Sequence, residues 1–254
     1  MVSERKAKIL EMKAACLPKD KRSGPFIDRQ LYVEIGFLFT RLFVKTRITP
    51  NQITLIWGIG MILSSIMFIF DNVWLHIAGA VGWILFYCMD STDGQVARYK
   101  KIYSERGTFI DLHNHCVNYP VLFFCIGLGQ FLVSGEIYNI IFGFIAGMFM
   151  LLITMSHPIY DCILSYRHGY ERAQEPEKEL TDKERKINLL KDIAPQTFAN
   201  VFVIVLVASL LDAVFTIELF WMTSFLSIVI FAYAVCFFPL GFAMWTRQLY
   251  RRIT

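Results

Sequence analysis

The feature that most constrains this chain is a set of long runs that contain no Asp, Glu, Lys or Arg. Each run holds about 18–28 residues, which lets one helix cross roughly 30 Å of hydrocarbon. Transmembrane strands would alternate with a period of two, and these runs do not. We therefore predict an all-α integral membrane protein with six transmembrane helices. The six spans are Asn51–Phe70, Asn72–Met89, Leu112–Ser134, Ile137–Tyr160, Ile193–Leu211 and Leu219–Thr246.

Composition supports the same class. Hydrophobic residues make up 56% of the chain and charged residues 18%, against about 45–50% and about 25% in typical soluble domains. A soluble protein of this size does not need so much apolar surface, and the composition excludes disordered, collagen-like and coiled-coil chains. The net charge of +4 is too small to indicate nucleic-acid binding.

The positions of the basic residues predict the topology. All 25 Lys and Arg residues fall within 1–50, 91–110, 161–195 and the C-terminal tail, and the three alternate connections hold none. Basic residues accumulate on the cytoplasmic side of a membrane. We therefore expect both termini, the 90–110 loop and the 161–195 loop to face the cytoplasm.

The first 48 residues differ from the rest. We expect 1–48 to be a cytoplasmic extension, without a cleavable signal peptide, and 49–254 to be the membrane domain. The segment Asp28–Arg47 has a polar stripe at helical spacing and apolar residues elsewhere, which predicts an amphipathic helix on the membrane interface. The alternative is a helix that docks on a partner protein.

Two further patterns concern packing and redox state. The six cysteines contain no CxxC pair, so we expect free thiols rather than a zinc site or a disulfide framework. Gly143 and Gly147 form a GxxxG motif in the fourth span. That motif predicts either a dimer face or close packing inside the chain.

Carboxylates gather at the cytoplasmic ends of the second and third spans, where charge is costly. Asp90 and Asp93 are three residues apart, and Asp111 and His115 are four apart, so each pair shares one helix face. Two antiparallel helices can point these groups into one pocket. Clustered carboxylates repel one another unless a cation neutralises them, and oxygen ligands suit Mg²⁺ or Mn²⁺. The alternative is that these side chains only cap helices and pair with nearby arginines.

Three neighbours of the acids add to this interpretation. Gly94 and Ala97 are small and leave room for a ligand against the backbone, and Arg98 offers a fixed positive charge suited to a phosphate. His113 lies two residues before His115 and should face away from this pocket. His157, near the cytoplasmic end of the fourth span, either lines the same cavity or has a packing or capping role.

The pattern Asp90-x2-Asp93-Gly94-x2-Ala97-Arg98-x8-Gly107-x3-Asp111-x3 resembles the signature of the CDP-alcohol phosphotransferases, with seven of its eight fixed positions matched. The segment Thr49–Thr54 resembles the family's Pro-Asn-x-x-Thr entry to the first span. The resemblance covers roughly residues 46–250. It implies a six-helix homodimer with a cytoplasmic cavity and two divalent ions that hold a CDP-linked donor.

The resemblance also implies roles for individual residues. Asp90, Asp93 and Asp111 would be metal ligands. Four positions would lie along the CDP site, namely Gly94, Ala97, Arg98 and Gly107, and two would lie near the nucleotide, namely Asn51 and Thr54. At the eighth position the family has an aspartate that serves as general base and ligand of the second metal, and this chain has His115. Histidine can accept a proton from an attacking hydroxyl but suits hard Mg²⁺ less well.

We expect an enzyme of phospholipid synthesis that transfers a substituted phosphate group from a CDP-linked donor, CDP-diacylglycerol above all, to an alcohol, with release of CMP. An alternative is transfer of a CDP-linked polar head group to a lipid or polyol. A further alternative is a catalytically inactive homologue or an ion-binding transporter. A transporter would favour repeated halves with broken helices, and the sequence contains no repeat. Basic residues near the pocket, including Lys100 and Arg106, suit a phosphorylated acceptor but are equally explained by the charge bias of the cytoplasmic side.

Overall fold

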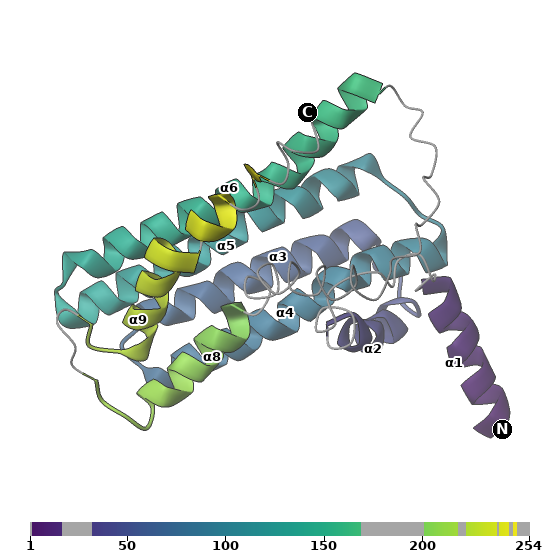
Figure 1. The fold of residues 1–254 in the computed structure, drawn as a ribbon. Coiled ribbons are helices and arrows are strands. Elements are labelled where there is room, and N and C mark those ends of the chain that lie inside the picture. The colour runs from purple at the N-terminus through teal and green to yellow at the C-terminus, as the bar shows by residue number, and fades with distance from the viewer. Residues whose placement is uncertain are drawn as a thin grey trace, which may run out of the picture.

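A computed structural model describes residues 2–16, 32–168, 201–217, 222–237, 239–243 and 246–247. Within these ranges all the elements of regular secondary structure are helices (Figure 1). The α-helices are α1 (Val2–Cys16), α2 (Val33–Phe43), α3 (Pro50–Ile66), α4 (Val73–Lys100), α5 (Glu105–Ser134), α6 (Ile137–His168), α8 (Val201–Asp212) and α9 (Phe225–Ala232). A 3₁₀ turn, η3 (Met67–Ile69), extends α3, and a π-helical turn, η4 (Tyr233–Phe237), extends α9.

The ends of the central helices follow from capping residues. Thr49 and Gln52 form a reciprocal capping box at the start of α3, and Pro50 occupies the first turn, where its missing N–H costs nothing. Ser104 caps α5 by accepting a hydrogen bond from the backbone N–H of Gly107. Lys101 ends α4 in the left-handed conformation. Because α5 already begins at Glu105, only a short connection separates the two helices. The last turns of α4 therefore lie beside the first turns of α5.

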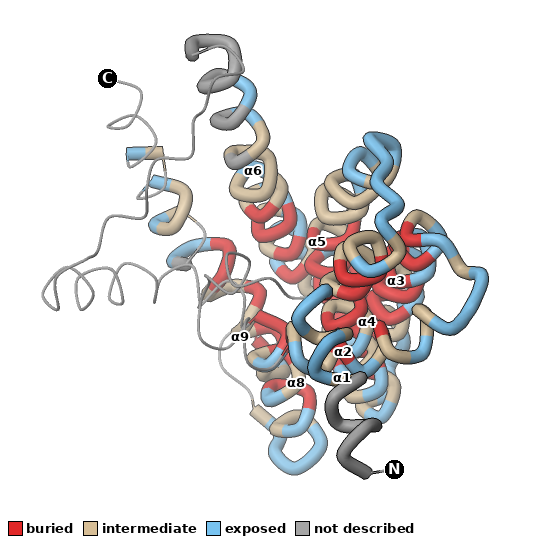
Figure 2. The backbone as a smooth tube through the Cα atoms, turned by 90° about the vertical axis from the view of Figure 1, so that its right-hand side faces the viewer, coloured by how far each residue is buried: buried red, intermediate tan, exposed pale blue. Residues whose placement is uncertain are grey.

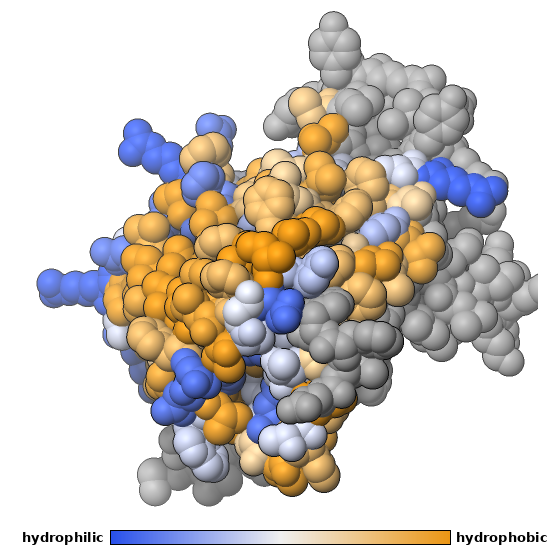
Figure 3. Space-filling model, turned by 90° about the vertical axis from the view of Figure 1, so that its left-hand side faces the viewer, coloured by the Kyte–Doolittle hydropathy of each residue, from blue (hydrophilic) through white to orange (hydrophobic). Residues whose placement is uncertain are grey.

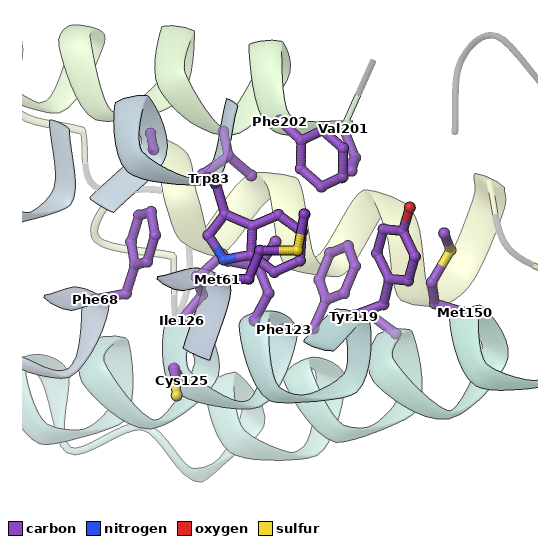
Figure 4. Packing of buried hydrophobic residues seen from close by; sticks show 14 of the residues in the cluster. Met61, Phe68, Trp83, Tyr119, Phe123, Cys125, Ile126, Met150, Val201 and Phe202 are labelled. Atoms are coloured by element: carbon purple, nitrogen blue, oxygen red, sulfur yellow. The ribbon is translucent and has the colours of Figure 1, made fainter. Parts of the chain in front are cut away.

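Helices α3, α4, α5 and α6 run side by side, with α8 against α4 and α9 against α6 (Figure 1). The buried residues lie where these helices face one another (Figure 2). Large aromatic side chains fill the centre (Figure 4), and Trp83 stacks on Phe202 with ring centroids 4.8 Å apart. This core fixes the relative positions of the helix ends that carry the functional residues.

Small residues allow α5 and α6 to approach closely. A Cβ atom on Gly143 would lie 2.6 Å from the backbone oxygen of Phe123 and 2.9 Å from the Cα of Gly127. One on Gly147 would lie 3.1 Å from backbone atoms of Pro120. A Cβ atom therefore has no room at Gly143 and little room at Gly147, so the GxxxG motif serves close packing of α6 against α5.

Five of the described helices are long and apolar enough to cross a membrane. They are Pro50–Ile69, Val73–Lys100, Glu105–Ser134, Ile137–Ser156 and Phe225–Ala243. Hydrophobic side chains cover much of the face in Figure 3, as contact with lipid requires. The chain is a multi-pass membrane protein. The remaining expected span, Ile193–Leu211, lies partly outside the described residues, and its described part is the short apolar helix α8. The six-span count therefore stays a prediction.

Helix α2 lies along the last turns of α4. Its buried residues are Gly36, Phe37 and Thr40, and the Thr40 hydroxyl donates to Gln95 Oε1 of α4 at 2.8 Å. Leu38 and Leu42 remain 56% and 66% exposed. A helix is therefore present over Val33–Phe43 of the expected segment, whereas its position on a membrane interface stays a prediction. Residues 28–31 of the expected segment lie outside the described residues.

Candidate active site

One pocket of about 210 Å³ lies where the start of α3 meets the end of α4 and the start of α5. Its lining includes all six residues for which the family resemblance implies a place near the CDP group, namely Asn51, Thr54, Gly94, Ala97, Arg98 and Gly107. Asp93 and Asp111 also line it. Residues separated by more than 50 positions in the sequence thus share one cavity, because the short connection after α4 brings α5 back beside it.

The wall between α3 and α5 depends on a glycine. A Cβ atom at Gly107 would lie 2.6 Å from the side-chain oxygen of Asn51, so any larger residue would push Asn51 aside. The amide nitrogen of Asn51 also lies 3.5 Å from the hydroxyl oxygen of Ser104, the capping residue of α5. Asn51 is therefore held against the first turn of α5 at the edge of the pocket.

Asp90, Asp111 and His115 form a cluster beside the pocket, with one possible ligand atom from each lying within 4.8 Å of the others. His115 Nε2 is 3.4 Å from Asp90 Oδ1 and 3.7 Å from Asp111 Oδ1. Asp111 Oδ1 is a buried oxygen without a hydrogen-bond partner. Since buried polar atoms are almost always satisfied, this oxygen marks a position that suits a divalent cation. The donor set of two carboxylates and one imidazole fits Mn²⁺ better than Mg²⁺.

Asp93 lies next to this cluster and is held by other partners. Its Oδ2 accepts hydrogen bonds from the Thr54 hydroxyl at 2.7 Å and from the Trp57 indole N–H at 3.2 Å. Its Oδ1 accepts a hydrogen bond from the backbone N–H of Gly94 at 2.5 Å. In the described part of the chain, the three-residue cluster does not include Asp93. The predicted set of acids therefore divides into the cluster of Asp90 and Asp111 with His115, and a separately oriented Asp93.

The basic side chains near the pocket have different partners. The Nε of Arg98 donates to the backbone oxygen of Cys16 at 2.7 Å, and its guanidinium lies beside Gly94 in the pocket wall. The last residue of α1 thus fixes one edge of the Arg98 side chain. Burial raises the pKa of the Cys16 thiol, and the nearby charge of Arg98 opposes that rise. Cys16 is therefore a packing residue rather than a reactive thiol.

Lys100 belongs to the framework rather than to the pocket. Its ammonium donates to the backbone oxygens of Phe43, Thr46 and Ile48 at 3.3, 2.9 and 2.9 Å. All three protons are therefore used to hold the connection between α2 and α3 against the end of α4. Lys100 has no proton left for a phosphorylated substrate.

The sequence also singled out His113 and His157. His113 is exposed and stacks on Phe109 with ring centroids 6.0 Å apart, which confirms that it faces away from the acids. The side chain of His157 lies outside the described residues.

Sequence reasoning missed several residues of this site. Tyr103, Ser104 and Thr108 line the pocket, and Trp57 contacts Asp93 and His115. Ser104 carried a detectable signal, because a serine three residues before a helical glycine is a typical capping residue. Trp57 carried none, since one tryptophan within an apolar span is usually a packing residue.

Comparison with known protein families decides the assignment. The family model described as CDP-alcohol phosphatidyltransferase matches residues 47–229. The chain belongs to the CDP-alcohol phosphatidyltransferase family. The matched region contains every residue of the pocket and the acidic cluster. A comparison with curated proteins yields no match. Family membership implies transferase activity with a CDP-alcohol donor and an alcohol acceptor, and it is consistent with a divalent cation at the acidic cluster.

Proposed function

We propose that this protein transfers a substituted phosphate group from CDP-diacylglycerol to the hydroxyl of a small polar alcohol, in phospholipid synthesis. The acceptor oxygen forms a bond to the phosphorus next to the diacylglycerol, and the bond from that phosphorus to the CMP oxygen breaks. CMP leaves with the electron pair, and the hydroxyl proton passes to a base on the protein. The observation that carries the proposal is the single pocket in which the predicted CDP-binding positions meet Asp93 and Asp111.

The pocket residues have distinct proposed roles. Arg98 supplies a fixed positive charge for the pyrophosphate of the donor. Gly94, Ala97 and Gly107 have small side chains or none, so the nucleotide can lie against the backbone of the pocket wall. Asn51, held at the edge of the pocket by Ser104, offers an amide near the nucleotide.

We further propose that Asp90, Asp93, Asp111 and His115 hold divalent cations, with Mn²⁺ or Mg²⁺ as the ions and two as their number. A bound ion would neutralise phosphate oxygens and polarise the phosphorus. The unpartnered Asp111 Oδ1 supports the first ion. Asp93 already accepts three hydrogen bonds, and hydrogen-bonded carboxylates are common among metal ligands.

We propose His115 as the general base. It occupies the position of the family's last aspartate, one turn after Asp111 on the same face of α5. Its Nε2 lies close to carboxylate oxygens of Asp90 and Asp111, and this nitrogen can accept the hydroxyl proton only while it is not bound to the ion. A neutral imidazole suits this proton transfer, which is typically worth 10²–10⁴-fold in rate.

Two properties of the assembly are also proposals. The basic residues cluster at the end of the bundle that holds the pocket, which supports a pocket that opens to the cytoplasm. Family resemblance supports a homodimer, although the GxxxG motif is already used between α5 and α6.

The test measures CMP release by the purified protein in lipid vesicles, with CDP-diacylglycerol or CDP-choline as donor and Mn²⁺ or Mg²⁺ present. We expect release from CDP-diacylglycerol when an alcohol acceptor is added. Asp111→Asn should lower the rate by at least about 10²-fold, because it weakens the binding of a cation that stabilises the transition state by several kcal/mol. The control Asp71→Asn changes an exposed acid at the opposite end of α4 and should retain activity. Release from CDP-choline alone would instead assign head-group transfer, and release from neither donor would contradict the proposal.

A further inference from the structure

Trp57 connects the two parts of the acidic site. It lies on α3, one turn after Thr54, and its side chain is fully buried. Its indole N–H donates to Asp93 Oδ2 at 3.2 Å. The same ring lies against the His115 ring, with centroids 5.2 Å apart and planes inclined by 42°. One side chain from α3 therefore contacts an acid of α4 and the imidazole of α5.

These contacts fix orientation as well as position. The Trp57 indole and the Thr54 hydroxyl both donate to Asp93 Oδ2, and the backbone N–H of Gly94 donates to Oδ1. Because α3 supplies the donors to one oxygen and α4 supplies the donor to the other, the carboxylate has little freedom to rotate. The His115 ring is confined in a similar way, because Tyr119 stacks on it with centroids 5.9 Å apart.

We propose that Trp57 is a positioning residue that orients the Asp93 carboxylate and the His115 ring toward a divalent cation. The inference rests on the proposed function, because it assigns Trp57 a role at that site. Groups that hydrogen-bond to metal ligands typically change metal affinity by 10–100-fold when removed. Indole suits this role because it is rigid and its N–H needs an acceptor when buried.

The competing explanation is that Trp57 only fills the core, and the chain offers a matched control. Trp83 on α4 is 1% exposed and also donates its indole N–H to a side-chain oxygen, that of Ser65, at 2.7 Å. Its ring lies against Phe202 and Tyr119, with centroids 4.8 and 5.8 Å apart, so its link to the His115 ring is indirect, through Tyr119. Replacing either tryptophan by phenylalanine removes one buried N–H donor and part of one aromatic ring, and only Trp57→Phe removes a donor from Asp93.

The experiment compares wild type, Trp57→Phe and Trp83→Phe in the full-length purified protein. Thermal unfolding measures stability, and electron paramagnetic resonance measures Mn²⁺ binding in the absence of any substrate. We expect both variants to lose stability. We expect the Kd for Mn²⁺ to rise by about 10–100-fold in Trp57→Phe and by less than threefold in Trp83→Phe. Thr54→Val, which removes the other donor to the same oxygen, should shift the Kd in the same direction as Trp57→Phe.

Equal Mn²⁺ affinity in Trp57→Phe and wild type would overturn the inference and leave Trp57 as a packing residue. An equal loss of affinity in both tryptophan variants would also overturn it, because the effect would then follow from stability. Wild-type protein that binds no Mn²⁺ at millimolar concentration would overturn it as well. Failure of the proposed function is separate, since it appears as absent CMP release whatever the Mn²⁺ affinity.

Discussion

Replacing Lys100 by methionine should destabilise the fold without weakening nucleotide binding. The Lys100 ammonium donates to three backbone oxygens in the connection between α2 and α3, two of them at 2.9 Å. Hydrogen bonds from charged donors contribute about 1.5–3 kcal/mol each. Because Lys100 is only partly buried, water can replace some of this, and we expect a net loss of about 2–4 kcal/mol in the free energy of unfolding.

A loss of that size corresponds to a decrease in Tm of roughly 5–15 °C for a domain of this length. Thermal unfolding of the purified protein in detergent would measure it. Lys101→Met provides the control, because the neighbouring Lys101 is exposed and the same substitution there should change Tm little. Lys100→Arg retains the charge but not the compact ammonium, so we expect it to recover only part of the stability.

The measurement also separates two roles for Lys100. If it holds the connection before α3, the KM for the CDP-linked donor and for the acceptor should stay within about threefold of wild type at a temperature where the variant is folded. An unchanged Tm with a strongly raised KM would refute the reasoning, since Lys100 would then contact a substrate instead of the backbone.

Two further predictions concern the base and the topology. His115→Ala should lower the rate of CMP release by about 10²–10⁴-fold and His115→Asp should retain activity, whereas activity gained by His115→Asp over an inactive wild type would show that this chain is a catalytically inactive form. With the exposed Cys162 and Cys236 replaced by serine, a cysteine at the exposed Tyr103 should react with an impermeant maleimide only from the cytoplasmic side of vesicles, and a cysteine at Asp71 only from the other side; the opposite pattern would contradict the predicted orientation.

Local chemistry accounts for the parts of this protein that the sequence predicted well. Uncharged apolar runs must be helical in a membrane because every backbone polar group needs an internal partner, and five such helices are present. The motif from Asp90 to His115 indicated the site because its spacing places the acids on the facing sides of two consecutive helices. The capping box at Thr49 is likewise a local feature, which starts α3, and the glycine at 107 leaves room for Asn51 at the edge of the pocket.

Only the tertiary structure decided which side chains share partners. The sequence treated Asp93 as equivalent to Asp90 and Asp111, but the donors Thr54 and Trp57 come from α3 and orient Asp93 separately. The GxxxG motif fitted a dimer face or an internal contact equally well until α5 was found packed against it. From the sequence, Lys100 fitted either the charge bias of the cytoplasmic side or a role in substrate binding. In the structure its ammonium instead donates to three backbone oxygens. The physical reason is common to all three: helical spacing fixes which residues share a face, whereas the partner of that face depends on how distant helices pack.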